Sequence, residues 1–528
     1  MNNSAGSITR RNFVAAASVA AAAAATASTR AYAEEAAEIK AGTPDETVET
    51  DIVIVGAGCA GMMAAYEAGK AGVEKIVVVS NSQSALDTNG SMVSGTSAVE
   101  TSYTKDAGET ETIEQMFEQM IGFGHWTMNA RLLKTCTEYL SGNVDVYDEM
   151  GIDFQLGADR GGFGYLNVHL FMTPDKGAVM QQYLEDNFGV EFRYGMELTA
   201  PVMDGDKVVG VQCVDAEGKL VEIDAKAVLL ACGGYIDNPE MLAETYGDMD
   251  IVACSAGHND GMGIKVAQAA GAFRESVYGL GMNDIFGSSA TLGFNMSNQL
   301  LAIAFYGGLL VNENGERFTN EYMVAQESMG GGGESLLHAK RYYTVISQAL
   351  VDELKTQSYY SIIGEPEYWH CGALLYTNPI ENIDDLLVEA EELGWVTKAA
   401  SVDELVEKAG LPELAATLTE YNEMAAAGED TIFYKKPEML RPIETDGDLY
   451  LIAYNPGAFN TFGGCRTDKF CRALRADFSV VEGLYIAGVE NGSLYSRPYY
   501  EVGGSCSGLA LSSGRLAGQQ MAAEVLGA

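Results

Sequence analysis

The sequence predicts an α/β fold, in which a Rossmann-like domain built from both ends of the chain is interrupted by an inserted α+β capping domain. The first observation is the run DIVIVGAGCAG at 51–61, an apolar strand that passes directly into the spacing GxGxxG. A helix-like segment at 62–72 and a second apolar strand at 75–79 follow it. A strand that ends in glycine returns at 483–488. Strands that alternate with helices are typical of a parallel sheet.

The GxGxxG spacing is the first candidate binding site. Gly56 permits the tight turn, Gly58 lets the backbone approach a diphosphate, and Gly61 lets the helix pack against the strand. Free amides at the start of that helix favour a negatively charged group. A glycine-rich turn without a ligand is the less favoured alternative, because the motif has the required strand before it and helix after it. We therefore expect Gly56, Ala57, Gly58, Ala60 and Gly61 to bind a dinucleotide.

Residues 1–33 are predicted to be an export signal rather than part of the fold. Arg10 and Arg11 precede an alanine-rich apolar stretch, and the small residues at 31–33 suit a cleavage site. The arrangement indicates a twin-arginine signal, and a basic start on a flexible alanine tail is the alternative. Because this route carries folded proteins, a bound cofactor can travel with the chain. We expect a soluble periplasmic or extracytoplasmic protein, with 34–48 as a short disordered lead-in.

The composition limits the possible partners. The 528 residues include 74 Asp and Glu against 32 Lys and Arg, and the formal net charge of −42 disfavours nucleic acid and anionic lipid. An acidic surface suits a basic electron-carrier protein, although solubility or a salty habitat is the commoner cause. No apolar run is long enough for stable membrane insertion. The nine cysteines lack CxxC and CxxCH spacings, which argues against a c-type haem or an iron–sulfur motif, and we expect no metal site.

Further glycine-rich segments complete the predicted domain. A loop of glycine and hydroxyl residues at 88–95 can bring backbone amides close to a flat ring. A hairpin strand is expected at 207–214, and a buried strand within 227–235 ends in a glycine pair. The sequence NDG at 259–261 opens a helix with an Asp or Asn cap, and the pair at 503–504 starts a final helix.

These segments come from both ends of the chain, so a middle segment must be inserted between them. We expect the dinucleotide-binding domain to comprise 49–284 and 456–528, and the capping domain to comprise 285–455. The chain is long enough for two domains with separate cores.

Taken in order, the motifs resemble those of the flavoproteins that include soluble fumarate reductases, urocanate reductases and 3-ketosteroid dehydrogenases, within the FAD-dependent fumarate reductase and succinate dehydrogenase family. The resemblance covers nearly all of the chain after 1–33. It rests on GxGxxG, ACGGY at 231–235, NDG at 259–261, GERFTNE at 315–321, FGG at 462–464, LYIAG at 484–488 and GG at 503–504. It implies bound FAD, a capping domain that closes over substrate, and hydride transfer between flavin N5 and an activated carbon–carbon bond.

The resemblance also implies which residues hold FAD. Ser80 stands where an acidic ribose ligand usually ends the second strand, so that hydrogen bond must come from a neutral hydroxyl or from elsewhere. At the ribityl position Val489 follows the glycine, and Glu490 takes the role one residue later. Besides the fingerprint, the expected FAD-binding residues are Ser80, Thr88, Asn89, Gly90, Ser94, Gly95, Ala231, Gly233, Gly234, Asp260, Gly261, Glu490, Ser505 and Cys506.

The catalytic positions depart from the fumarate reductase pattern. Those enzymes clamp two carboxylates with arginine and histidine and deliver a proton through an Arg-Glu-Arg relay. The relay positions fall at Leu301, Ala304 and Ala325 here, and the clamp positions fall near Asn283, at Phe459 or Asn460, and at Glu501. A buried dicarboxylate would lack counter-charges, and the loss of one buried charge partner costs about 3–5 kcal/mol. Fumarate is therefore a poor candidate substrate.

Tyrosines surround the altered positions. Tyr306 and Tyr322 flank the relay, and Tyr499 and Tyr500 precede the last glycine pair. Tyrosine offers an apolar face and one hydroxyl, which suits a neutral aromatic or polycyclic substrate. Tyr500 matches the tyrosine of ketosteroid dehydrogenases and is the candidate general acid, with Tyr499 beside it; the alternative is that these tyrosines line a domain interface. Arg497 is a candidate cation for a substrate carbonyl or carboxylate, or it forms a surface ion pair.

Three functions remain open. The first is an exported FAD-dependent reductase of an activated C=C bond in an enone, an aryl acrylate or an unsaturated lactone. Because the chain has no haem motif, its electrons would come from a separate cytochrome or membrane quinol-linked donor protein. The second is a 3-ketosteroid-type dehydrogenase running in the oxidative direction, and the third is a flavin-binding protein without catalysis.

Overall fold

The computed structural model describes residues 39–157, 168–275, 278–281, 285–287, 300, 303, 308–326, 331–363, 378–499 and 502–528. The predicted export signal at 1–33 lies outside these residues. Within them, no helix combines the length and the apolar character that a membrane span needs.

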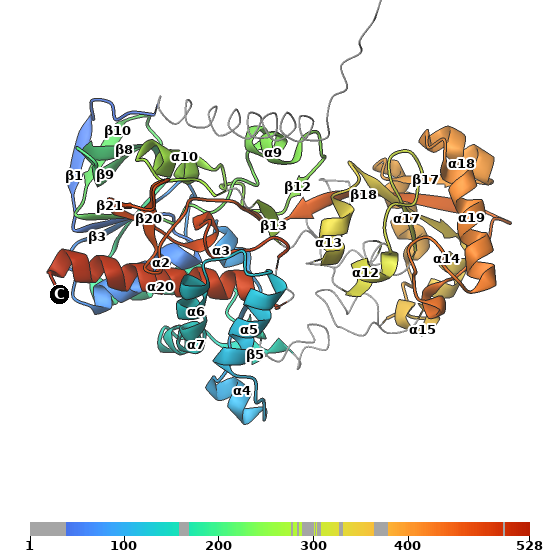
Figure 1. Ribbon diagram of the computed structural model, residues 1–528, viewed down its shortest axis with the longest axis horizontal. Coiled ribbons are helices and arrows are strands. Elements are labelled where there is room, and N and C mark those ends of the chain that lie inside the picture. Colours follow the sequence, from blue (N-terminus) through green and yellow to red (C-terminus); the bar gives the residue numbers. More distant parts are fainter. Residues whose placement is uncertain are drawn as a thin grey trace, which may run out of the picture.

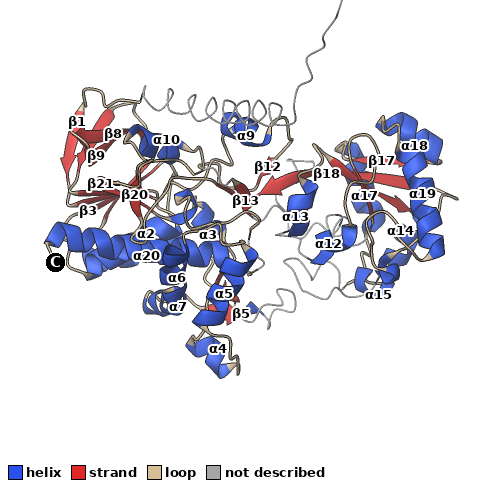
Figure 2. Cartoon of the chain, viewed as in Figure 1, coloured by secondary structure: helices blue, strands red, loops and turns tan. Residues whose placement is uncertain are grey.

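A six-stranded sheet forms the centre of the larger lobe. Its order is β20 (Arg472–Leu474), β21 (Val480–Ile486), β11 (Ala227–Leu230), β2 (Ile52–Val55), β3 (Ile76–Ser80) and β7 (Glu191–Tyr194). The strands from β21 to β7 pair in parallel, and β20 is antiparallel to β21. Strands from residues 52–230 and from residues 472–486 therefore meet in one Rossmann-like sheet, as the sequence predicts (Figures 1 and 2).

Two helices pack together across one face of this sheet. Helix α2 (Cys59–Lys70) follows β2 directly, and α20 (Ser505–Leu526) is the last helix of the chain (Figure 1). A Cβ built on Gly514 of α20 would lie 2.1 Å from the Ala60 carbonyl oxygen of α2, and one on Gly518 would lie 2.4 Å from that of Ala64. These glycines let the two backbones touch, and the contact fixes the start of α2.

A second sheet contains the predicted hairpin and a segment that the sequence predicts to be disordered. Its order is β1 (Glu46–Glu49), β10 (Leu220–Asp224), β9 (Lys207–Val214) and β8 (Glu197–Asp204). The expectation of a disordered lead-in is wrong for 39–48. Strand β1 pairs in parallel with β10, and the Gly42 amide donates to the Gln212 side chain at 2.7 Å. Strand β1 contains one apolar residue, Val48, and three polar ones, which suits an edge strand with one exposed face.

The second lobe, here called the capping lobe, is built on a mixed sheet. Its path is β12 (Val252–Ala253), β18 (Leu449–Ala458), β16 (Tyr342–Ser347) and β15 (Leu309–Val311), and β14 (Ile285–Gly287) and β17 (Val396–Ala399) also pair with β18. Its helices are α12 (Glu321–Gln326), α13 (Gly331–Leu336), α14 (Gln348–Leu354), α15 (Tyr359–Ile363), α17 (Ile383–Glu392), α18 (Val402–Ala409) and α19 (Leu414–Ala427), with the 3-10 turn η3 (Pro437–Met439). Figure 1 shows this lobe at the opposite end from α20.

A buried ionic cluster holds the GERFTNE turn in the capping lobe. The Arg317 guanidinium donates to Glu321 at 2.8 Å and to Asp430 at 2.7 Å, and Lys435 Nζ lies 3.4 Å from Glu321. All four side chains are almost completely buried. Arg317 and Glu321 therefore stabilise the turn that begins α12.

Smaller elements complete the larger lobe and join it to the capping lobe. Strands β4 (Gly95–Ser97), β6 (Val168–Phe171) and β5 (Phe154–Leu156) form a small antiparallel sheet, and β13 (Gly279–Gly281) pairs with β19 (Asn460–Phe462). The remaining helices are α3 (Asn89–Met92), α4 (Ser102–Asp106), α5 (Ile113–Phe123), α6 (Ala130–Glu138), α7 (Leu140–Glu149), α8 (Lys176–Phe188), α9 (Pro239–Tyr246) and α10 (Met262–Ala269), with the 3-10 turn η4 (Gly488–Glu490).

Candidate cofactor and active site

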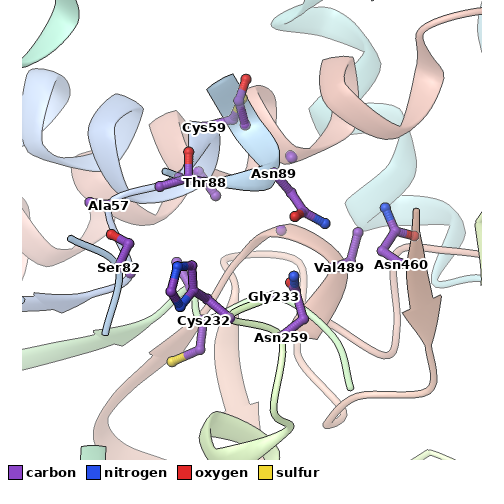
Figure 3. A pocket seen from close by; sticks show the side chains of 18 of the residues that line it. Ala57, Cys59, Ser82, Thr88, Asn89, Cys232, Gly233, Asn259, Asn460 and Val489 are labelled. Carbon is purple, nitrogen blue, oxygen red and sulfur yellow. The ribbon is translucent and has the colours of Figure 1, made fainter. Parts of the chain in front are cut away.

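A deep pocket opens at the carboxyl ends of β2, β3 and β11, where ligands bind in sheets of this kind. In Figure 3, Thr88 and Cys59 lie on one side, Cys232 and Asn259 lie opposite, and Asn460 lies at one end. The pocket is lined by Val55, Gly56, Ala57, Gly58, Cys59, Ala60, Ser80, Asn81, Ser82, Asp87, Thr88, Asn89, Gly90, Met92, Val93, Ser94, Met196, Leu198, Ala231, Cys232, Gly233, His258, Asn259, Asp260, Met262, Gly263, Gly281, Phe459, Asn460, Gly488, Val489, Cys506, Ser507 and Ala510.

The three fingerprint glycines occupy different environments. Gly56 has φ +112°, and a Cβ on it would lie 2.2 Å from the Ala231 carbonyl oxygen. A Cβ on Gly61 would lie 1.9 Å from the Gly56 carbonyl oxygen, whereas one on Gly58 would meet no atom within 4 Å. Gly58 is also the N-cap of α2 and makes no side-chain cap. The open space in front of Gly58 fits a diphosphate held by the amides of α2.

Neutral hydroxyls and one carboxylate occupy the end of β3. Ser80 Oγ and Ser82 Oγ are hydrogen bonded at 2.8 Å, and both residues line the pocket. His258 Nε2 lies 2.7 Å from the Asp87 carboxylate, which also lines the pocket. The structure therefore offers two hydroxyls and Asp87 in the region where the family resemblance requires a ribose ligand. His258 belongs to the wall of the cofactor pocket.

Asn89 ties three segments together at the middle of the pocket. Its Nδ2 donates to the Phe459 carbonyl at 2.8 Å, and its Oδ1 accepts from the Ala256 amide at 2.8 Å. Thr88 caps α3 by accepting from the Ser91 amide at 3.1 Å. The predicted glycine and hydroxyl loop is thereby fixed as a pocket wall.

The start of α20 forms a further part of the wall, beside strand β4 of the small sheet. Its N-cap is Gly504, with φ +75° and no side-chain cap. Cys506 and Ser507 line the pocket, and Ser507 Oγ donates to the Gly95 carbonyl at 2.6 Å. This 22-residue helix therefore presents its positive end to the pocket, which favours negative charge on a bound ring.

At the predicted clamp-histidine position, the pocket is neutral. Asn460 Nδ2 lies 3.4 Å from Cys506 Sγ, and Asn460 Oδ1 is buried without a hydrogen-bond partner among the described residues. Phe459 is adjacent and also lines the pocket. Among the described residues there is no group of His, Cys, Asp and Glu that could hold a metal ion.

The described catalytic candidates lie outside the pocket lining. Tyr499 is 2% exposed, stacks on Phe462 and accepts from the Cys506 amide at 3.2 Å. Arg497 Nε donates to Glu334 of α13 at 2.8 Å, and its side chain is 47% exposed. Tyr500 lies outside the described residues, as do Asn283, Leu301, Ala304, Tyr306, Glu501 and the side chain of Ala325.

Six of the predicted FAD-binding residues are not among the residues that line the pocket: Gly61, Gly95, Gly234, Gly261, Glu490 and Ser505. Gly261 is the N-cap of α10, and the predicted side-chain cap comes one residue earlier, since Asp260 accepts from the Met262 amide at 2.8 Å. Glu490 is fully buried and accepts from the Cys232 amide at 2.8 Å. Burial raises the pKa of Glu490 to about 8, although the hydrogen bonds from Cys232 lower it.

Several lining residues were missed by sequence reasoning. Met196 and Leu198 enter the pocket at the start of β8, and apolar residues there carry no motif. Asn81 and Ser82 follow β3 directly, so their position after a parallel strand is a signal that predicts ligand contact.

Comparison with known proteins identifies the family. The family model described as FAD binding domain matches residues 51–506. A vinyl phenol reductase from Lactiplantibacillus plantarum is 25% identical over 493 residues, which cover 89% of this chain and 96% of that protein. A fumarate reductase (cytochrome) from Shewanella frigidimarina is 25% identical over 497 residues, which cover 91% of this chain and 78% of that protein.

A solved structure shows the same fold. The 3-ketosteroid-Δ4-(5α)-dehydrogenase from Rhodococcus jostii RHA1, in complex with 4-androstene-3,17-dione, superposes with a TM-score of 0.61 at 21% identity. The match covers 92% of this chain and 99% of that one. The family match and these relatives confirm the resemblance stated from the motifs. The chain belongs to the FAD binding domain family, with the fumarate reductase flavoproteins, and is an FAD-dependent oxidoreductase.

Proposed function

We propose that this oxidoreductase reduces the activated C=C bond of a neutral unsaturated molecule, of the enone, aryl acrylate or unsaturated lactone type. The observation that carries the proposal is the neutral end of the pocket, which is lined by Phe459 and Asn460; the resemblance implies a clamp histidine at one or the other of these positions. A dicarboxylate would find no cation among the described residues that line this pocket except a protonated His258, which is bonded to Asp87. The vinyl phenol reductase, whose name denotes an uncharged alkene, is a relative over nearly its whole length.

Each group of the site would have a separate role in the reduction. FAD, when bound and reduced by the donor protein, would supply the hydride for one carbon of the double bond. Asn460 Oδ1 is available to accept a hydrogen bond from a donor group of a bound molecule, because this buried oxygen has no partner among the described residues. Tyr500 would deliver a proton to the second carbon, so that hydride and proton together saturate the bond. The Asn89 bonds to Phe459 and Ala256 hold this wall in position.

The electrons would come from a separate donor protein, and the chain would act after twin-arginine export. Replacement of both Arg10 and Arg11 by lysine should leave the protein in the cytoplasm, while the unaltered chain should be recovered outside it. Recovery of both proteins in the same fraction would contradict export by this route.

The substrate class can be tested by anaerobic reoxidation of the chemically reduced protein. The flavin absorbance is followed after addition of enones, cinnamates, unsaturated steroids or fumarate. Rapid reoxidation by a neutral or aromatic alkene, and not by fumarate, is expected. Reoxidation by fumarate alone would contradict the proposed neutral site. Reduction of the oxidised flavin by a saturated 3-ketosteroid, without reoxidation by any alkene, would favour the dehydrogenase direction, and no reaction in either direction would favour a flavin-binding protein without catalysis.

The proton donor can be tested by Tyr500→Phe. If Tyr500 is the general acid, substrate turnover should fall by about 10² or more, because general acid catalysis typically contributes this factor. The reduction of the flavin by dithionite should be unchanged. Turnover within about threefold of the unaltered enzyme would exclude Tyr500 as the donor.

A further inference from the structure

Lys176 is a buried cation beside the cofactor pocket. It is the first residue of α8, and its side chain is 4% exposed. The ammonium donates to the Ser91 carbonyl and lies 4.7 Å from the centroid of the Phe171 ring. These two contacts hold the ammonium at a defined place.

No carboxylate pairs with Lys176 among the described residues, whereas Arg515 and Arg317 both have carboxylate partners. Arg515 contacts Glu67 at 2.6 Å, and Arg317 contacts two carboxylates. Burial lowers the pKa of Lys176, which is the direction expected of an ammonium without a counter-anion. A buried charge is costly unless an opposite charge lies nearby, so an anion supplied by a ligand would stabilise it.

The ammonium lies directly behind the pocket wall. Its partner Ser91 belongs to α3, and the neighbouring residues Gly90, Met92 and Val93 all line the pocket. The start of α8 presses against this segment, because a Cβ built on Gly177 would lie 2.4 Å from Ser91 Oγ. A charge at this place therefore acts on a bound cofactor through one layer of protein.

The FAD that this family binds brings two kinds of negative charge. The diphosphate is always charged, whereas the flavin ring gains one negative charge when two electrons and one proton add to it. The diphosphate already has the free amides at the start of α2. The 88–95 loop in front of Lys176 touches the start of α2 at Gly90, where a Cβ would lie 2.6 Å from the Cys59 amide nitrogen. Through Asn89 the same loop is bonded to Phe459, next to Asn460 and the start of α20 (Figure 3).

We propose that Lys176 is a redox-tuning residue, a buried positive charge behind the 88–95 loop that stabilises the negative charge of the reduced flavin. It acts through the loop and is a positioning residue rather than a catalytic one. Its charge makes reduction of the bound flavin more favourable, because the interaction is stronger in the reduced state than in the oxidised state. The inference depends on bound FAD and on no property of the substrate.

The test is the midpoint potential of the purified holoprotein, titrated anaerobically without substrate against a reference dye. Lys176→Met removes the charge and keeps an apolar stem over Phe171, while Lys176→Gln removes the charge and keeps a hydrogen-bond donor for Ser91. Lys176→Arg keeps the charge. Lys105→Met, at an exposed lysine of α4 in the same lobe, is the matched control.

Both neutral variants should shift the ratio of reduced to oxidised flavin at least tenfold towards the oxidised form, which corresponds to a potential about 30 mV lower for two electrons. Lys176→Arg and Lys105→Met should stay near the potential of the unaltered protein. Equal potentials in all five proteins would overturn the proposal. Weaker FAD binding in both redox states, with an unchanged potential, would also overturn it and assign the charge to the diphosphate. None of these outcomes depends on which alkene the enzyme accepts.

Discussion

Gly58 differs from Gly56 and Gly61 in its surroundings. No atom of the described residues fills the space in front of Gly58, so a ligand can occupy it. Gly56 and Gly61 each face a carbonyl oxygen at a distance that no Cβ can occupy. A Cβ on Gly58 meets nothing within 4 Å. The fold therefore requires two of the glycines, and the cofactor requires the third.

The first prediction concerns Gly58→Ala. We expect the variant to fold with a near-normal circular dichroism spectrum, and we expect its FAD affinity to fall by about tenfold or more, equivalent to about 1.4 kcal/mol. The added methyl group would occupy the space where the diphosphate approaches the backbone. Fluorescence titration of the apoprotein with FAD measures the effect. Gly61→Ala is the comparison and should lower stability even without FAD, so equal behaviour of the two variants would contradict this division of roles.

Glu490 gives a prediction about pH. Burial raises its pKa to about 8 from a reference value of 4.5. Between these values the folded state holds a proton that the unfolded state has released, so the contribution of Glu490 to stability is complete below pH 4.5 and declines as the pH rises towards 8. The slope is at most about 1.4 kcal/mol per pH unit. Glu490→Gln keeps an acceptor for the Cys232 amide and removes this loss.

The measurement is the melting temperature of both proteins, followed by flavin release, from pH 5 to pH 8. The melting temperature of Glu490→Gln relative to the unaltered protein should rise steadily across this range. A difference that stays constant with pH would mean that Glu490 is ionised in the folded protein.

At the scale of elements, the contact between α2 and α20 links the end of the chain to the cofactor site. Sequence reasoning predicts both helices, because each follows a glycine motif at the end of a strand. It could not predict their contact, because the contact depends on small residues, and small residues at this spacing are common to many helices. Gly514 shows the difference, since its Cβ would lie 2.1 Å from the Ala60 carbonyl oxygen.

Gly514→Ala is therefore expected to be harmful although alanine favours helices. In an open helix this change stabilises by about 0.5–1 kcal/mol. Here α2 must move away from α20, and its first turn carries the diphosphate amides, so both the melting temperature and the FAD affinity should fall. Gly122→Ala in α5 is the matched control, because its Cβ would meet nothing within 4 Å and the variant should be as stable as the unaltered protein or more so. An equal gain in both variants would show that α2 and α20 tolerate separation.

Strand β1, at 46–49, is an element that the sequence does not predict. Residues 46–49 read as ETVE, which has too few apolar side chains to indicate a strand. The strand forms because its backbone pairs with β10, a partner more than 170 residues away along the chain. Such pairing leaves no local pattern, whereas the buried strands β2, β3 and β11 are visible as apolar runs.

At the scale of the whole molecule, β18 and several ion pairs connect the two lobes. Strand β18 belongs to the capping sheet, and β19 follows it immediately and pairs with β13 beside the pocket. Lys340 contacts Asp248 at 2.7 Å, and Arg497 contacts Glu334 at 2.8 Å. The sequence motifs indicate an insertion between the two halves of the larger lobe. They do not show that Arg497, a predicted substrate-binding residue, forms an ion pair with Glu334 of α13 in the capping lobe.

The last prediction separates the two roles of Arg497. If the arginine serves as a contact between the lobes, Arg497→Met and Glu334→Gln break the same ion pair and should change alkene-dependent reoxidation equally. The Arg497 side chain is 47% exposed and that of Glu334 is 17% exposed, so solvent screens the pair and its value is about 0.2–1 kcal/mol. Each variant should therefore lose no more than about fivefold. The double variant should match the single ones, because the second change has nothing left to break. We expect this result, since Arg497 is absent from the described pocket lining. A loss of about 10² in Arg497→Met with near-normal Glu334→Gln would show instead that the guanidinium leaves Glu334 and binds the substrate oxygen during the reaction.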